Sequence, residues 1–193
     1  MNILVINGSP HVKGTSALLM EEFIRGAQEK GHEIHVFHAA REDVHPCIAC
    51  DTCRKTGNGC VFKDGMEKLN PMLADAELVV FVTPLYYFGM SAQIKAVFDR
   101  FYANNTALRE QQKKTIVLAT CGDTEDWTFD ALKHHFEDAF RYMRWTCIGS
   151  VYALGMYVRE DIEQSDYPRE AYELGRSRSE EHTSELQSPR TIS

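Results

Sequence analysis

The feature that most constrains the fold is the stretch over residues 2–16, NILVINGSPHVKGTS. It opens with four aliphatic residues, Ile3 to Ile6, a run too short for a buried helix, which the Asn7-Gly8 step then ends. A short, wholly apolar run of this kind is typical of a strand buried on both faces of a parallel sheet. We therefore predict that this run is the central strand of such a sheet.

The loop after this strand leads into a helix over residues 17–30, where apolar residues recur at every fourth position. The N–H groups of a first helical turn lack partners within the helix, and the helix dipole adds positive charge there. Hydroxyl groups of Ser9, Thr15 and Ser16 add further hydrogen-bond donors. Together these features predict a binding site for a phosphate group.

The glycine spacing in this loop excludes two common nucleotide-binding motifs. A dinucleotide-binding loop reads G-x-G-x-x-G, whereas five residues separate Gly8 from Gly14. A nucleoside triphosphate loop reads G-x-x-x-x-G-K-[ST], whereas Lys13 precedes its glycine. The loop therefore suits a single terminal phosphate, such as that of FMN, or it is an ordinary strand-to-helix turn capped by serine or threonine.

Composition limits the partners that the chain can have. The 193 residues carry a net charge of −7 at pH 7 and no basic patch, which argues against nucleic acid and anionic lipid as partners. We see no leader and no apolar run of membrane length, so we predict a cytoplasmic protein that does not enter a membrane.

We predict a single domain over residues 1–177. From Arg178 the sequence reads RSEEHTSELQSPRTIS, in which Leu186 and Ile192 are the only aliphatic residues. This segment resembles the translation of a sequencing-library adapter, so we interpret residues 178–193 as a non-native tail and exclude them. The alternative is a natural polar tail, which would carry no function either.

Further apolar runs alternate with helical segments along the chain. We predict strands over residues 33–38, 77–83, 115–120 and 147–154, and helices over 65–76, 91–102, 129–143 and from 167 onward. Five strands alternating with helices form a doubly wound parallel sheet of the α/β class. Ligands bind such sheets at the carboxyl ends of the strands. Lys95, Asp99 and Arg100 are expected on the solvated face of the helix over 91–102.

Three segments together resemble a known family. They read GSPHVKGTSALL, then CIACDTC with a later cysteine and KDGM, then TPLYYFGMSAQIKAVFDRFY. The combination is similar to the NADPH-dependent FMN reductase and iron-sulfur flavoprotein group and covers the chain from Met1 to about Gly175. The resemblance implies a flavodoxin-like three-layer sandwich whose five-stranded parallel sheet has the order 2-1-3-4-5.

The resemblance also implies an FMN site. It assigns Ser9, Thr15 and Ser16 to the phosphate. It places the flavin ring between two segments whose residues are Pro84, Leu85, Tyr86, Tyr87, Phe88, Gly89, Thr120, Cys121 and Gly122. A flat ring needs an apolar wall and a few backbone donors, which supports this assignment, and core packing is the alternative for the three aromatic residues.

The activity implied by the resemblance is that of an NAD(P)H-dependent FMN oxidoreductase, which passes electrons to a small-molecule or protein acceptor. No catalytic acid or base is assigned, because hydride transfer between two rings needs chiefly positioning. A flavodoxin-like electron carrier and a redox or metal sensor on the same frame are the rival interpretations. A homodimer or homotetramer is expected, because a neighbouring subunit often completes an exposed aromatic wall.

The long segment over residues 39–63 contains four of the six cysteines: Cys47, Cys50, Cys53 and Cys60. Their spacing matches the ligand pattern of the iron-sulfur flavoproteins, and two residues between ligands let a short loop wrap four thiolates around a [4Fe-4S] cluster. Zinc also accepts four thiolates, and a loop of free thiols without metal is the third interpretation. The sequence leaves all three open.

Overall fold

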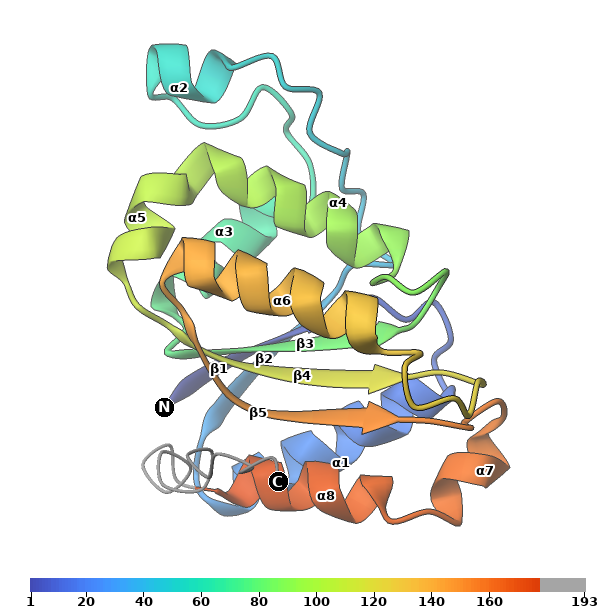
Figure 1. Cartoon of the computed structure of the whole chain (residues 1–193). Coiled ribbons are helices and arrows are strands. Elements are labelled where there is room, and N and C mark those ends of the chain that lie inside the picture. The colour runs from blue at the N-terminus through green and yellow to red at the C-terminus, as the bar shows by residue number, and fades with distance from the viewer. Residues whose placement is uncertain (178–193) are drawn as a thin grey trace, which may run out of the picture.

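A five-stranded, wholly parallel sheet forms the centre of the computed structural model, which describes residues 1–177 (Figure 1). Its strands are β1 (Asn2–Asn7), β2 (Glu33–His38), β3 (Leu78–Pro84), β4 (Lys114–Thr120) and β5 (Thr146–Ala153). Their order, β2-β1-β3-β4-β5, confirms the predicted topology. The tail predicted over residues 178–193 lies outside the described residues.

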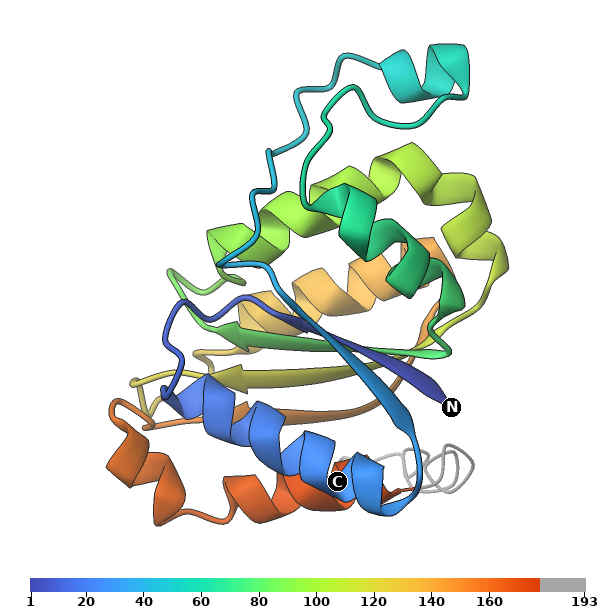
Figure 2. The same cartoon turned by 180° about the vertical axis from the view of Figure 1, so that it is seen from behind.

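The helices cover both faces of this sheet, as Figures 1 and 2 show from opposite sides. One layer holds α1 (Thr15–Glu29), α7 (Arg159–Glu163) and α8 (Tyr167–Arg176). The other holds α3 (Met66–Asp75), α4 (Ala92–Arg100), α5 (Asn105–Glu110) and α6 (Asp130–Met143), with α2 (Thr52–Thr56) beyond them. The result is the three-layer sandwich that the sequence predicts.

The central strand supplies side chains to both halves of the core. Leu4 and Ile6 pack with the α3, α4 and α6 layer, whereas Ile3 and Val5 pack with the α1 and α8 layer. Successive residues of a strand point to opposite faces, which explains this division and why an uninterrupted apolar run is needed here. Each of these four side chains is almost fully buried and stabilises the fold by roughly 1.5–3 kcal/mol.

Close backbone packing joins the first and last helices. A Cβ added at Gly26 of α1 would lie 2.2 Å from the carbonyl oxygen of Tyr172, and one at Gly175 of α8 would lie 2.1 Å from that of Phe23. Only glycine leaves room for two helix backbones at this separation. The packing of α8 on α1 therefore extends the ordered core to the end of the described chain.

The short helices α2, α5 and α7 were not predicted from the sequence. They span five, six and five residues, too few for an apolar repeat to be recognised. In the described part of the chain, we find no helix that combines the length and apolar character required to cross a membrane.

Candidate functional site

An open cleft of about 950 Å³ lies at the carboxyl ends of β1, β3 and β4. The sequence-predicted residues that line it are Ser9, Thr15, Ser16, Pro84, Leu85, Tyr86, Thr120, Cys121 and Gly122. They come from three loops that are far apart in the sequence, and the parallel sheet brings these loops together. Tyr87, Phe88 and Gly89 are not among the residues that line the cleft.

The loop after β1 is fixed against the neighbouring elements by its backbone. Gly8 donates its N–H to the carbonyl oxygen of Val82 at 2.9 Å, and its own carbonyl accepts a hydrogen bond from Oγ of Ser91 at 3.0 Å. A Cβ at Gly8 would lie 2.3 Å from Cγ1 of Ile94. The glycine is therefore required because the loop touches the first turn of α4.

Helix α1 presents an uncapped amino terminus to the cleft. Gly14 occupies the N-cap position, no side chain caps the first turn, and that turn contains no acidic residue. Its free N–H groups and the helix dipole favour an anion at this position. A terminal phosphate therefore fits the arrangement.

Three hydroxyl groups meet beside this helix terminus. Oγ1 of Thr120, at the end of β4, lies 2.9 Å from Oγ1 of Thr15 and 2.7 Å from Oγ of Ser16. Ser16 and Thr120 are almost completely buried. Because these hydroxyls hydrogen-bond to one another, the amino terminus of α1 is held at a fixed position over the end of β4.

The aromatic segment after β3 forms a tight turn. Tyr86 and Gly89 exchange backbone hydrogen bonds of 3.0 and 3.1 Å, and the two residues between them, Tyr87 and Phe88, have left-handed φ angles of 47° and 63°. Bulky residues seldom adopt this conformation, which costs of order 1–3 kcal/mol at each position. Such strain is most common at functional sites.

Two of the three aromatic side chains of this turn do not line the cleft. Tyr87 is fully exposed, and Phe88 stacks on Trp127 with a ring-centroid distance of 5.2 Å. Tyr86 alone of the three lines the cleft, at 45% exposure. None of the three side chains is buried, so the alternative interpretation, core packing, is wrong.

The sequence analysis missed the wall that follows β5. Its residues lining the cleft are Met156, Tyr157, Val158 and Arg159. Met156 donates its N–H to the carbonyl oxygen of Cys121 at 2.7 Å, so this wall is attached to the loop after β4. The signal that could have found it is its position, since it follows the carboxyl end of a fifth parallel strand.

Two ionisable side chains at the cleft, Asp123 and Cys121, have shifted pKa values. Hydrogen bonds from the hydroxyl of Thr128 and from backbone N–H groups lower the pKa of Asp123. Burial raises the pKa of the Cys121 thiol, so this thiol stays protonated at neutral pH and is a weak nucleophile. Lys13 and Arg159 line the same cleft and contribute positive charge.

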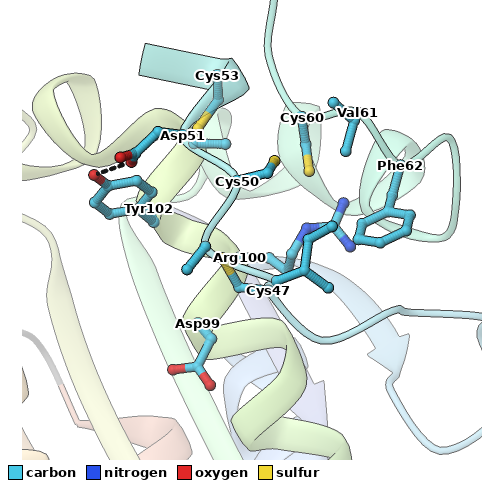
Figure 3. Close-up of a pocket in the computed structure, with 13 residues that line it drawn as sticks. Cys47, Cys50, Asp51, Cys53, Cys60, Val61, Phe62, Asp99, Arg100 and Tyr102 are labelled. Atoms are coloured by element: carbon cyan, nitrogen blue, oxygen red, sulfur yellow. Dashed lines mark hydrogen bonds between the residues drawn. The ribbon is translucent and has the colours of Figure 1, made fainter. Parts of the chain in front are cut away.

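The four clustered cysteines lie elsewhere, beyond the carboxyl-terminal end of α4 (Figure 1). Cys47, Cys50, Cys53 and Cys60 line one small cavity, and Figure 3 shows their side chains around it. As the side chains stand, we find no group of three or more His, Cys, Asp or Glu residues within residues 1–177 that could hold a metal ion. The cavity measures only about 20 Å³, and two of the four cysteines, Cys47 and Cys50, are exposed.

The chemistry of this cavity nevertheless suits a metal group. Four thiol donors lie around one space, and the hydroxyl and backbone N–H of Thr52 lower the pKa of the Cys50 thiol through hydrogen bonds. The thiolate is the form that binds metal. A cation also lines the cavity, because Arg100 is buried there.

The burial of Arg100 corrects the expectation that it lies on the solvated face of its helix. Its side chain is 2% exposed and pairs with Asp64, whose side chain is 1% exposed. Asp64, in the segment that precedes α3, supplies the counter-charge that makes burial of a guanidinium tolerable. Lys95 and Asp99, by contrast, are partly exposed and pair with each other.

The fold and the cleft define a flavodoxin-like protein of the kind that binds a mononucleotide at the carboxyl ends of its strands. Within this class, the chain belongs to the NADPH-dependent FMN reductase family, whose model matches residues 1–158.

The proteins similar to this chain include iron-sulfur flavoproteins and an FMN-containing oxidoreductase. An iron-sulfur flavoprotein of Archaeoglobus fulgidus is 43% identical over 98 residues, which are 51% of this chain and 49% of that protein. A Bacillus subtilis protein, provisionally named an NAD(P)H-dependent FMN-containing oxidoreductase, is 26% identical over 80% of this chain and 84% of its own. The chain spans about half the length of the iron-sulfur flavoproteins that it matches.

Solved structures show the same fold. The NAD(P)H:quinone oxidoreductase from Methanothermobacter marburgensis superimposes with a TM-score of 0.72 at 19% identity, covering 90% of this chain and 94% of that one. An azoreductase from Bacillus anthracis gives a TM-score of 0.71 at 16% identity, covering 90% and 98%.

We predict that Thr120→Val destabilises the protein without added ligand. The substitution keeps the side-chain shape but leaves the buried hydroxyl of Ser16 without its partner, which costs about 1–3 kcal/mol. Urea unfolding would measure the loss. Thr106→Val, at an exposed position of α5, is the matched control and should change stability by less than about 0.5 kcal/mol. Equal stability of the two variants would contradict the role given to the hydroxyl cluster.

Proposed function

We propose that this chain is an FMN-dependent NAD(P)H oxidoreductase that passes electrons from a reduced nicotinamide, through bound FMN, to a small-molecule or redox-protein acceptor. The observation that carries the proposal is the cleft itself. There, an uncapped helix terminus with buried hydroxyls stands opposite a largely apolar wall. Membership of the FMN reductase family supports the same conclusion.

The phosphate end of the cleft is the loop after β1. Ser9, Thr15 and Ser16 would donate hydrogen bonds to the terminal phosphate, beside the N–H groups of the first turn of α1. Lys13 adds positive charge at the same edge. The absence of acidic residues from that first turn means that no carboxylate of the turn repels the phosphate.

The ring end of the cleft has two sides. Pro84, Leu85 and Tyr86 supply an apolar side, and Thr120, Cys121 and Gly122 supply the other. Tyr87, Phe88 and Gly89, which the resemblance also assigns to the ring, form the adjoining turn and do not line the cleft in this structure. When bound, FMN accepts a hydride and passes on electrons, and the chain contributes position and electrostatics.

The protonated thiol of Cys121 fits this role. A buried neutral thiol packs against a ring like a small apolar group and adds no negative charge beside it. The chain therefore orients the reacting rings without a nucleophile of its own at this position.

We expect the FMN-loaded protein to lose its visible flavin absorption when NADPH or NADH is added without oxygen. We also expect Ser16→Ala to weaken FMN binding roughly 10- to 100-fold, since a hydrogen bond to a charged group contributes about 1.5–3 kcal/mol. Fluorescence titration measures the affinity, and Ser150→Ala, at an exposed position, is the matched control. A flavin that binds but is reduced by neither nicotinamide would instead favour a flavodoxin-like carrier or a redox sensor.

A specific observation favours a second redox group in the same chain. Cys47, Cys50, Cys53 and Cys60 are distant from the cleft but line a common cavity that also contains a buried cation. We propose that these four thiolates hold a [4Fe-4S] cluster, which supplies one-electron transfer. The iron-sulfur flavoproteins among the similar proteins support this choice over zinc or free thiols.

Anaerobic reconstitution with iron and sulfide should load about four irons per chain. Cys53→Ser should lose most of this iron, because the replaced residue is a proposed ligand. Cys147→Ser, on β5 and outside the cavity, should retain it. Zinc without sulfide in the purified protein would indicate the zinc alternative, and a chain that takes up neither metal would indicate a loop of free thiols.

We also propose that a second copy of the chain covers the aromatic turn after β3 in a homodimer or homotetramer. Tyr87 and the stacked pair of Phe88 and Trp127 form an exposed aromatic surface beside the cleft. Sedimentation should therefore show more than one chain per particle. Tyr87→Ser should weaken this association more than Tyr142→Ser, which changes an exposed tyrosine of α6 outside this surface. A wild-type protein that sediments as a single chain would contradict the proposal.

The cytoplasm is the compartment that we propose for this activity. All six cysteines are free, and several are exposed. Exposed thiols stay reduced where glutathione and thioredoxin operate.

A further inference from the structure

The guanidinium of Arg100 contacts both ends of the segment that carries the four clustered cysteines, residues 45–64, here called the cysteine segment. Nη1 and Nη2 donate to the two carboxylate oxygens of Asp64 at 2.6 and 3.2 Å, and Nη1 also donates to the carbonyl oxygen of His45 at 2.7 Å. The group lies over the ring of Phe62, with its Cζ 5.2 Å from the ring centroid. His45 precedes the first cysteine of the segment, and Phe62 and Asp64 follow the last one.

These partners also contact one another, so the two ends of the segment meet at Arg100. His45 donates its N–H to Oδ2 of Asp64 at 3.1 Å, and its ring stacks on Phe62 with a centroid distance of 4.8 Å. The ends of the loop that carries all four clustered cysteines are therefore anchored on one buried side chain of α4.

One donor of Arg100 remains unused. Its Nε is buried and, among the described residues, has no hydrogen-bond partner. Leaving a buried donor unpaired costs about 1–3 kcal/mol, so such an atom in a native structure calls for an explanation. Arg100 lines the cysteine cavity, and Figure 3 shows the side chain of Cys60 directed toward it.

The charged residues that line the cavity also favour a contact between Arg100 and a thiolate. Among its described lining residues, Arg100 is the only cation, whereas Asp51 and Asp99 are acidic. Arg100 is therefore the one side chain of this lining that can donate a charge-assisted hydrogen bond to a thiolate.

We propose that Arg100 is a positioning residue for the cysteine site: it anchors both ends of the segment and presents its free Nε–H to a metal-bound thiolate at Cys60. The inference rests on the proposed [4Fe-4S] site and adds a residue outside the ligand set. Hydrogen bonds to the sulfurs help to set the reduction potential of such clusters, and groups behind the ligands govern metal retention.

Arg100→Lys tests the role of Nε most sharply. Lysine keeps a positive charge for Asp64 but lacks the planar fork and the Nε–H. After anaerobic reconstitution with iron and sulfide, we expect this variant to lose iron to a chelator roughly 10- to 100-fold faster than the wild type. Its cluster should also have a more negative midpoint potential, because a hydrogen bond that stabilises the reduced sulfurs is missing.

A double variant provides a second test if Arg100→Lys does not fold. Asp64→Asn with Arg100→Gln removes both charges of the buried pair together, which avoids an uncompensated charge. It should show the same direction of change in iron loss and potential. Arg54→Lys is the matched control, because Arg54 is an exposed arginine of the same segment that does not line the cavity. It should stay within about twofold of the wild-type rate of iron loss.

The metal-free chain supplies a further readout. Limited proteolysis should cut residues 45–63 faster in Arg100→Lys than in Arg54→Lys, because the ends of the segment are no longer held together. If the wild type takes up no iron, the cluster proposal fails and this inference fails with it. If the loaded wild type and Arg100→Lys share one rate of iron loss and one potential, only the role of Arg100 is overturned.

Discussion

The contact between Gly8 and the first turn of α4 fixes the position of the cleft. The backbone of Gly8 is held between Val82 and Ser91, and its Cα lies where no larger residue fits against Ile94. Because the loop is fixed there, the amino terminus of α1 stands over the end of β4, where its hydroxyls reach Thr120. The proposed phosphate site thus results from the packing of a sheet and two helices.

Helix α4 links the two candidate sites. Its amino-terminal end, capped by Ser91, holds the loop after β1, and its carboxyl-terminal end buries Arg100 under the cysteine segment. The nine residues of this helix span about 14 Å. Within one chain, the cleft and the cysteine cavity therefore lie at opposite ends of a single rigid element.

Much of this architecture could be predicted from the sequence, because its signals are local. The buried run of β1, the glycine-punctuated loop and the strands that alternate with helices define the sheet, and the bounds of β2 match the prediction. The parallel sheet then brings three of the predicted loops to one cleft. The same logic, applied to β5, would also have found the wall at Met156–Arg159.

Other features depend on contacts that no local pattern reveals. The turn at Tyr87 and Phe88 requires a left-handed backbone at both residues. Bulky residues seldom adopt this conformation, so their sequence does not predict it. The helical spacing predicts that Arg100 lies on the solvated face of its helix. It is buried because Asp64, which is distant in the sequence, pairs with it. The hydroxyl cluster likewise pairs Ser16 with Thr120 across more than a hundred residues.

The central claim is that the amino terminus of α1 grips a mononucleotide by its phosphate. The most direct test compares the affinities of the purified protein for FMN and for riboflavin, which has the same ring without the phosphate. The account predicts that FMN binds at least about 100-fold more tightly, because the phosphate forms several charge-assisted hydrogen bonds. Equal affinities, or no binding of either flavin, would contradict it.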